Sequence, residues 1–149
     1  MASSSELIHR MFDTFSIVQY FKQEKTYLKL EEACFDKLHE AGYTIPFKDE
    51  RTRKYKWPSW GSGGFEYFDF LGYTEDSLVL GECKLFSTNT VPIKTVEYFI
   101  DRIKKVKPGR RKIIAIFVSN TKLCKKGYTI FKNLKREGIE AIIYIRNWQ

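Results

Sequence analysis

Apolar residues recur at helical spacing in two well-marked stretches of the chain. The first covers residues 26–41 and is followed by Gly42, a residue type that commonly ends helices. The second begins near Pro92, which suits a first helical turn, and stops at Pro108-Gly109. Each stretch gathers its apolar residues on one side: Leu28, Cys34, Phe35 and Leu38 in the first, and Ile93, Val96, Ile100 and Ile103 in the second. The pattern therefore predicts two amphipathic helices.

Runs of apolar, aromatic and β-branched residues predict strands between and after these helices. Residues 66–73 and 78–85 are such runs, and the polar residues 74–77 join them, as in a hairpin. Residues 113–118 and 139–145 are almost continuously apolar, as in strands covered on both faces. The segment between these two runs, 124–135, is long enough for a crossover helix, so we expect the last two strands to be parallel.

The remaining segments complete a mixed α/β fold. Residues 43–47 suit a short strand, whereas the charged residues 48–56 and the glycine-rich residues 61–64 are typical of loops. A weaker helical stripe of Leu7, Met11, Phe15 and Val18 predicts a helical segment within an N-terminal extension, residues 1–25. We therefore expect one domain, residues 26–149, built as a mixed β-sheet flanked by helices.

The balance of charge favours a polyanionic partner. The chain of 149 residues has 26 Lys and Arg against 18 Asp and Glu, a formal charge of +8, and 43% hydrophobic residues supply a real core. Such a charge steers polyanions and gains from counterion release, so nucleic acid is the first candidate, with a merely soluble basic protein as the alternative.

The densest basic stretch is residues 48–56, which runs into Trp57-Pro58-Ser59-Trp60. Cationic and aromatic side chains alternate there, so the stretch suits gripping of phosphates and stacking on exposed bases. A solvated loop with two tucked tryptophans is the alternative, and composition leaves both open. The candidate nucleic-acid contacts are Lys48, Arg51, Arg53, Lys54 and Lys56.

Cysteines and the chain start indicate an intracellular protein. Cys34, Cys83 and Cys124 are odd in number and include no C-x-x-C pair, so we expect reduced thiols and no zinc site. His9 and His39 lack spaced partners and suit surface positions. The first residues show no secretory signal, and no run is long enough to span a membrane. The expectation is a cytoplasmic protein that is neither secreted nor membrane-bound.

The hairpin brings three charged residues onto one face. If its turn is centred between Glu75 and Asp76, paired residues sum to 151, which sets Asp69 directly opposite Glu82. Lys84 returns to the same face two residues later, while Cys83 points away. The positions around them are apolar and aromatic, so this is not a solvated strand.

Two close, partly desolvated carboxylates repel each other and require a shared proton, a cation or a structural ion pair. Mg²⁺ prefers carboxylate oxygens and is commonly held by one or two of them together with substrate phosphate. A lysine beside such an ion can orient the attacking water and offset charge on the phosphate. The alternative is that Lys84 merely neutralises Glu82 in a buried ion pair while Asp69 caps a turn.

At these residues the chain resembles a known family. Asp69, twelve intervening residues and then Glu82-Cys83-Lys84 resemble the D-x(n)-(D/E)-x-K core of the PD-(D/E)xK nuclease superfamily, which has the restriction-endonuclease-like fold. The order of elements over residues 26–145 is similar to that of Mrr-like restriction enzymes and archaeal Holliday junction resolvases. Phe68 stands where the family name has proline, and the extension 1–25 is not part of the family core.

The resemblance implies metal-assisted hydrolysis of DNA that leaves 5′-phosphate and 3′-hydroxyl ends. Asp69, Glu82 and the backbone carbonyl of Cys83 would be the metal ligands, and Lys84 would position the attacking water. Members of this family often carry a glutamate on the preceding helix, near the metal. Glu31 suits that role because it interrupts the apolar stripe of its helix, whereas Glu32 lies nearer the solvated edge. Snorkelling at the helix edge or pairing with a lysine is the alternative for Glu31.

The sequence thus predicts a Mg²⁺-dependent deoxyribonuclease, with Mn²⁺ as a substitute for Mg²⁺ and DNA as the partner. A Holliday junction resolvase is the nearest enzymatic rival, because the core chemistry is the same for both. A non-cleaving nucleic-acid-binding module of the same fold is the rival from another class. Whether the chain acts as a homodimer is left open.

Overall fold

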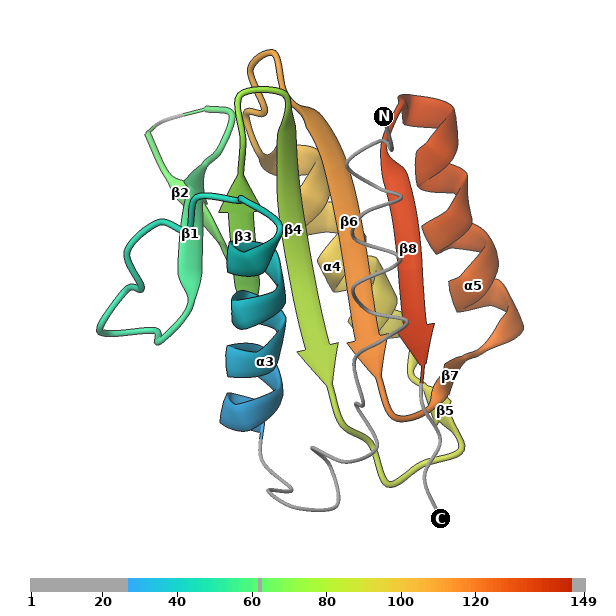
Figure 1. The fold of residues 1–149 in the computed structure, drawn as a ribbon. Helices are drawn as coiled ribbons and strands as arrows, with labels where there is room; N and C mark the ends of the chain where they lie inside the picture. The colour runs from blue at the N-terminus through green and yellow to red at the C-terminus, as the bar shows by residue number, and fades with distance from the viewer. Residues whose placement is uncertain (1–26, 62, 146–149) are drawn as a thin grey trace.

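A four-stranded mixed sheet forms the centre of the molecule (Figure 1). The structure is a computed structural model that describes residues 27–61 and 63–145, so the predicted helix within residues 1–25 lies outside the described part. The sheet order is β3-β4-β6-β8. The sheet strands are β3 (Phe70–Tyr73), β4 (Ser77–Lys84), β6 (Lys112–Ser119) and β8 (Glu140–Ile145).

Strand directions follow the hydrophobic pattern. The short turn after Tyr73 makes β3 antiparallel to β4, whereas β4, β6 and β8 run parallel to one another. Seven consecutive buried residues in β6 mark it as a central strand covered on both faces. The predicted crossover helix is α5 (Lys125–Lys132), continued by the 3-10 helix η1 (Asn133–Glu137). The predicted mixed sheet flanked by helices is confirmed.

Helices cover both faces of the sheet. On one face α3 (Tyr27–Glu40) packs Cys34 and Leu38 against the strands. On the other face α4 (Ile93–Lys105) and α5 form a second core, in which the ring of Phe99 stacks on Phe131. Because side chains alternate along a strand, even-numbered residues of β4 face α4 and odd-numbered residues face α3. None of the described helices is long and apolar enough to cross a bilayer.

The direction of α3 is set by contacts at both ends of β4. Near the end of the strand, the Sγ atoms of Cys34 and Cys83 lie 3.8 Å apart. At its beginning, the Ser77 hydroxyl donates to the Tyr43 hydroxyl oxygen at 3.0 Å or accepts from it. The helix therefore runs antiparallel to β4, as Figure 1 shows, and its first turn lies toward the strand's carboxyl end. No disulfide joins the three cysteines.

Two predictions for residues 43–58 need correction. Residues 43–47 do not form a strand, since only Thr44 bridges to Tyr73. The stretch expected to be loop ends in a strand, β1 (Tyr55–Pro58), which pairs antiparallel with β2 (Phe65–Phe68). Pro58 ends this edge strand, a position where a missing N–H is tolerated. Two further short strands, β5 (Thr90–Val91) and β7 (Lys122–Leu123), pair in parallel.

Candidate active site

A bend at Asp69 separates β2 from β3. The run before the bend pairs with β1, and the run after it pairs with β4, so the chain changes partner at this residue. The Asp69 N–H donates to the carbonyl of Gly81 at 3.0 Å, and the Cys83 N–H donates to Asp69 Oδ2 at 2.9 Å. The side chain is 3% exposed. Backbone groups of β4 therefore hold this carboxylate in one orientation.

Glu82 lies beside Asp69, as predicted from the position of the hairpin turn. Phe70 pairs with Gly81, and the same register continued by one residue sets Asp69 against Glu82. Glu82 is 1% exposed and faces α4. The Lys84 Nζ atom lies 3.3 Å from Glu82 Oε1, and Cys83 between them belongs to the core on the α3 face. The three residues of the predicted motif are thus brought together, with two carboxylates and one ammonium on the same side of the sheet.

Arg102 of α4 joins the site, and the sequence reasoning missed it. Its guanidinium forms an ion pair with Glu82 Oε2 and donates from Nη1 to the Tyr67 carbonyl at 2.7 Å. The same group lies over the rings of Phe68 and Phe99. A signal was present in the helix: Thr95, Tyr98 and Arg102 follow one another at spacings of three and four along the edge of the apolar stripe, and all three line the same pocket.

Lys54 is placed differently from the expectation. It was grouped with surface residues that grip phosphate, but its Nζ atom lies 2.8 Å from Asp69 Oδ1 and it is half-buried. The β1–β2 register explains this position, because Tyr55 pairs with Phe68 and the next pair outward is Lys54 with Asp69. The other members of the set, Lys48, Arg51, Arg53 and Lys56, are exposed.

The carboxylates do not ionise alike. Burial, with the neighbouring Asp69 charge, raises the pKa of Glu82 from its ordinary 4.5 to about 7, although Arg102 and Lys84 oppose the rise. Burial also acts to raise the pKa of Asp69, but the hydrogen bond with Glu82 and the Lys54 ammonium outweigh it and hold that pKa below the usual value. Below about pH 7 the pair therefore holds one proton, which resides mainly on Glu82.

The site opens into a pocket of about 250 Å³ lined by Lys54, Glu82, Lys84, Thr95, Tyr98 and Arg102. Glu82 Oε1 is buried at its edge, 3.3 Å from the Lys84 ammonium, and accepts no hydrogen bond from the residues that the structure describes. Two adjacent carboxylates at an open pocket have the donor chemistry that a hard divalent cation such as Mg²⁺ prefers. No group of three His, Cys, Asp or Glu side chains comes together among the residues that the structure describes. The side-chain donors for such an ion would therefore be the two carboxylates.

Glu31 belongs to α3, but its side chain lies outside the described part of the chain. The helix places its first turn toward the carboxyl end of β4, on the face opposite the Glu82 side chain. His39 is exposed on the same helix, as expected, and His9 lies outside the described residues.

Two solved structures are similar to the chain, both at low sequence identity. No known family model matches the chain, and no curated protein is significantly similar to it. A protein of unknown function, AF1548, is similar with a TM-score of 0.49 and 16% identity, over 72% of this chain and 52% of that one. The MspJI restriction endonuclease in complex with a 27-mer oligonucleotide is similar with a TM-score of 0.43 and 16% identity, over 97% of this chain and 30% of that one. The chain spans about half of the first protein and under a third of the second, and no inference about its chemistry rests on either likeness.

The raised pKa of Glu82 predicts a pH-dependent stability. A proton bound more tightly in the folded state stabilises it below pH 4.5, and this contribution is lost as the pH rises through about 7. In EDTA, the wild type should therefore lose about 3 kcal/mol more unfolding free energy between pH 5 and pH 8 than Glu82→Gln, which has no proton to lose. Urea unfolding of both proteins at the two pH values measures the difference. Equal losses would show that Glu82 titrates normally.

Proposed function

We propose that the chain is a Mg²⁺-dependent nuclease that hydrolyses phosphodiester bonds in DNA at the Asp69–Glu82 pocket. The observation that carries this proposal is a pair of buried carboxylates beside an open, cation-lined pocket. Glu82 Oε1 lies 3.3 Å from the Lys84 ammonium but accepts no hydrogen bond from the described residues. A buried carboxylate oxygen without a hydrogen bond costs free energy, and a bound metal ion would supply the missing partner.

Asp69 and Glu82 would hold the ion, and the Cys83 carbonyl stays a candidate third ligand. When bound, Mg²⁺ supplies Lewis-acid stabilisation of the charge that develops on the phosphate. Lys84 is partly exposed and reaches Glu82, so its ammonium is placed to orient the attacking water and to offset that charge. Arg102 adds a second cation whose position is held by the Tyr67 carbonyl. The exposed residues Lys48, Arg51, Arg53 and Lys56 would supply salt-dependent contacts to the DNA backbone.

One observation favours the non-cleaving module instead. Each carboxylate already has a cation against it, Lys54 on Asp69 and Arg102 on Glu82, so the charges balance without a metal. Such a network would bind DNA through its surplus positive charge and cut nothing. Cleavage by the wild-type chain in Mg²⁺ distinguishes the two functions. A nuclease also loses cleavage, but not DNA binding, when one catalytic group is removed.

We predict that Asp69→Asn, Glu82→Gln and Lys84→Ala each lower DNA cleavage in Mg²⁺ by about 10²-fold or more, because each removes a group that acts on the reacting atoms. DNA binding in EDTA should change little, since it comes from the distributed basic surface. Asn and Gln keep an oxygen in place, so the fold is preserved. Single-turnover cleavage and fluorescence anisotropy measure the two properties.

Lys126→Ala is the matched control for Lys84→Ala. Lys126 is exposed on α5, so its loss removes the same charge away from the pocket. Cleavage by this variant should stay near the wild-type rate. Wild-type rates in any of the three pocket variants would contradict the assignment of that residue, and wild-type rates in all three would move the active site elsewhere.

Although α3 covers the face opposite the Glu82 side chain, its first turn lies toward the carboxyl end of β4, and we also propose that Glu31 orients metal-bound water or a second ion there. Glu31→Gln should then lower the cleavage rate by about 10²-fold, the scale of a lost positioned catalytic group, while Glu32→Gln changes it little. The two substitutions are neighbours on one helix and remove the same charge, so each is the control for the other. Equal small effects of the two substitutions, or inactivity of Glu32→Gln alone, would rule out the placement of Glu31, rather than Glu32, at the site.

A further inference from the structure

The outer face of the β1–β2 hairpin carries one lysine among aromatic rings. Lys56 pairs with Tyr67 and Pro58 pairs with Phe65, and these side chains share one face of the ladder. Phe65 is 42% exposed, and the Lys56 ammonium lies 4.6 Å from the centroid of its ring. Tyr55 and Trp57 alternate onto the opposite face, where they pack against the core. The exposed residues of the hairpin are therefore on a separate face from the residues that pack against the core.

Trp60, which follows β1 in the chain, is a second exposed aromatic residue beside a lysine. Its side chain is 64% exposed, and the Lys107 ammonium lies 5.5 Å from its ring centroid. The backbone around it is held firmly, because the Trp60 N–H donates to the Lys105 carbonyl at 2.7 Å and the Lys107 N–H donates to Pro58 at 2.9 Å. An indole that is presented to solvent on a fixed backbone loses little entropy when a flat ligand stacks on it.

The other tryptophan of the same segment shows the contrast. Trp57 donates from Nε1 to the Lys107 carbonyl at 2.8 Å and packs against Tyr73, with Arg111 over its ring. Its polar atom and its ring are therefore both in contact with other residues. The sequence left two hypotheses for this segment. Trp57 is tucked against other residues, whereas the Trp60 ring faces solvent.

The hairpin face leads directly into the pocket. Continued by one residue, its ladder reaches Lys54 and Asp69, and the Tyr67 carbonyl within it accepts from Arg102. Phe65 lies four residues before Asp69, which corresponds to about 13 Å along a strand. A nucleic-acid strand whose phosphate lies at the pocket would therefore pass over Lys56 and Phe65 within a few nucleotides.

We propose that this hairpin face binds an unpaired stretch of DNA next to the phosphodiester at the pocket, with bases stacked on Phe65 and Trp60 and phosphates on Lys56 and Lys107. Exposed ring faces favour unpaired bases, because bases in a duplex are already stacked and offer only their edges. The two lysines supply the complementary charge for the backbone. This inference rests on the proposed function for the location of the cut, and it extends that function to the class of substrate.

The test is binding of a short labelled single strand, and of the duplex of the same sequence, to the full chain in EDTA. Phe65→Ala and Trp60→Ala should each weaken single-strand binding about tenfold and duplex binding by less than about twofold, since a stacked base is lost only from the unpaired ligand. Trp60→Phe should keep most of the affinity. Because the assay needs no metal and no cleavage, it can succeed or fail independently of the nuclease proposal.

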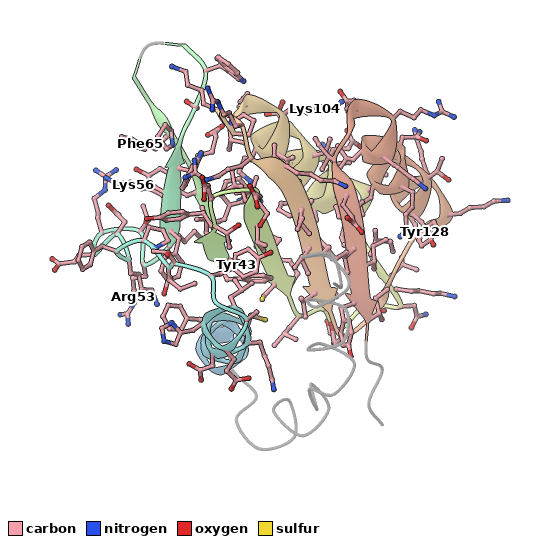
Figure 2. All side chains as sticks on the ribbon, turned by 45° about the horizontal axis from the view of Figure 1, so that its top comes forward. Tyr43, Arg53, Lys56, Phe65, Lys104 and Tyr128 are labelled. Atoms are coloured by element: carbon pink, nitrogen blue, oxygen red, sulfur yellow. The ribbon has the colours of Figure 1, made fainter. Side chains whose placement is uncertain are left out.

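Tyr128 supplies a matched control on the far side of the molecule. It is 50% exposed on α5, and Lys132 lies 5.6 Å from its ring centroid, so it repeats the exposed aromatic–lysine pair (Figure 2). Figure 2 places it opposite Lys56 and Phe65. Tyr128→Ala should leave single-strand binding unchanged. Equal losses for single strand and duplex, no loss in the hairpin variants, or the same loss in Tyr128→Ala would overturn the proposal.

Discussion

The carboxylates of Asp69 and Glu82 repel each other where water cannot screen them, and several elements of the fold meet around that repulsion. The bend between β2 and β3 presents Asp69 to the Cys83 N–H, and β4 carries Glu82 onto the same side. β1 contributes Lys54, and α4 contributes Arg102. The mixed sheet therefore does more than form a core, because it brings four chain segments to one pocket at its edge.

Two opposed carboxylates in such a place are costly unless something compensates them. The described residues compensate in two ways, with a proton shared between the carboxyls and with three cations. Replacing a buried ionic cluster by apolar residues is often neutral or stabilising, so stability alone is a weak reason for these groups. The open pocket supports the second reason that we propose, which is exchange of the internal cations for a metal ion and a phosphate.

The parts predictable from sequence are those governed by local periodicity. The polar turn residues set the hairpin register, and that register alone placed Asp69 against Glu82 and returned Lys84 to the same face. The apolar runs likewise predicted the parallel pairing of β6 and β8. These inferences needed only the two-residue period of strands and the length of the connections.

The parts that escaped prediction depend on tertiary position. Arg102 reaches Glu82 because of the way α4 lies across the sheet; the spacing of Thr95, Tyr98 and Arg102 puts them on one side of the helix but does not identify Glu82 as the partner. Lys54 belonged to a charged stretch predicted to be loop, and only the pairing of β1 with β2 places it beside Asp69. Trp57 and Trp60 lie three residues apart, and the docking of the β1–β2 hairpin on the end of α4 leaves the first half-buried and the second exposed.

The most direct test is a cleavage assay of the purified chain on linear duplex, single-stranded, flap and four-way-junction DNA, with Mg²⁺ and in parallel with EDTA. We predict cleavage of at least one substrate in Mg²⁺, with 5′-phosphate ends, and none in EDTA. We also predict no cleavage by an Asp69→Asn/Glu82→Gln double variant that retains DNA binding. Failure to cut any substrate in Mg²⁺ or Mn²⁺, or cleavage that persists in EDTA, would contradict a metal-dependent nuclease at this site.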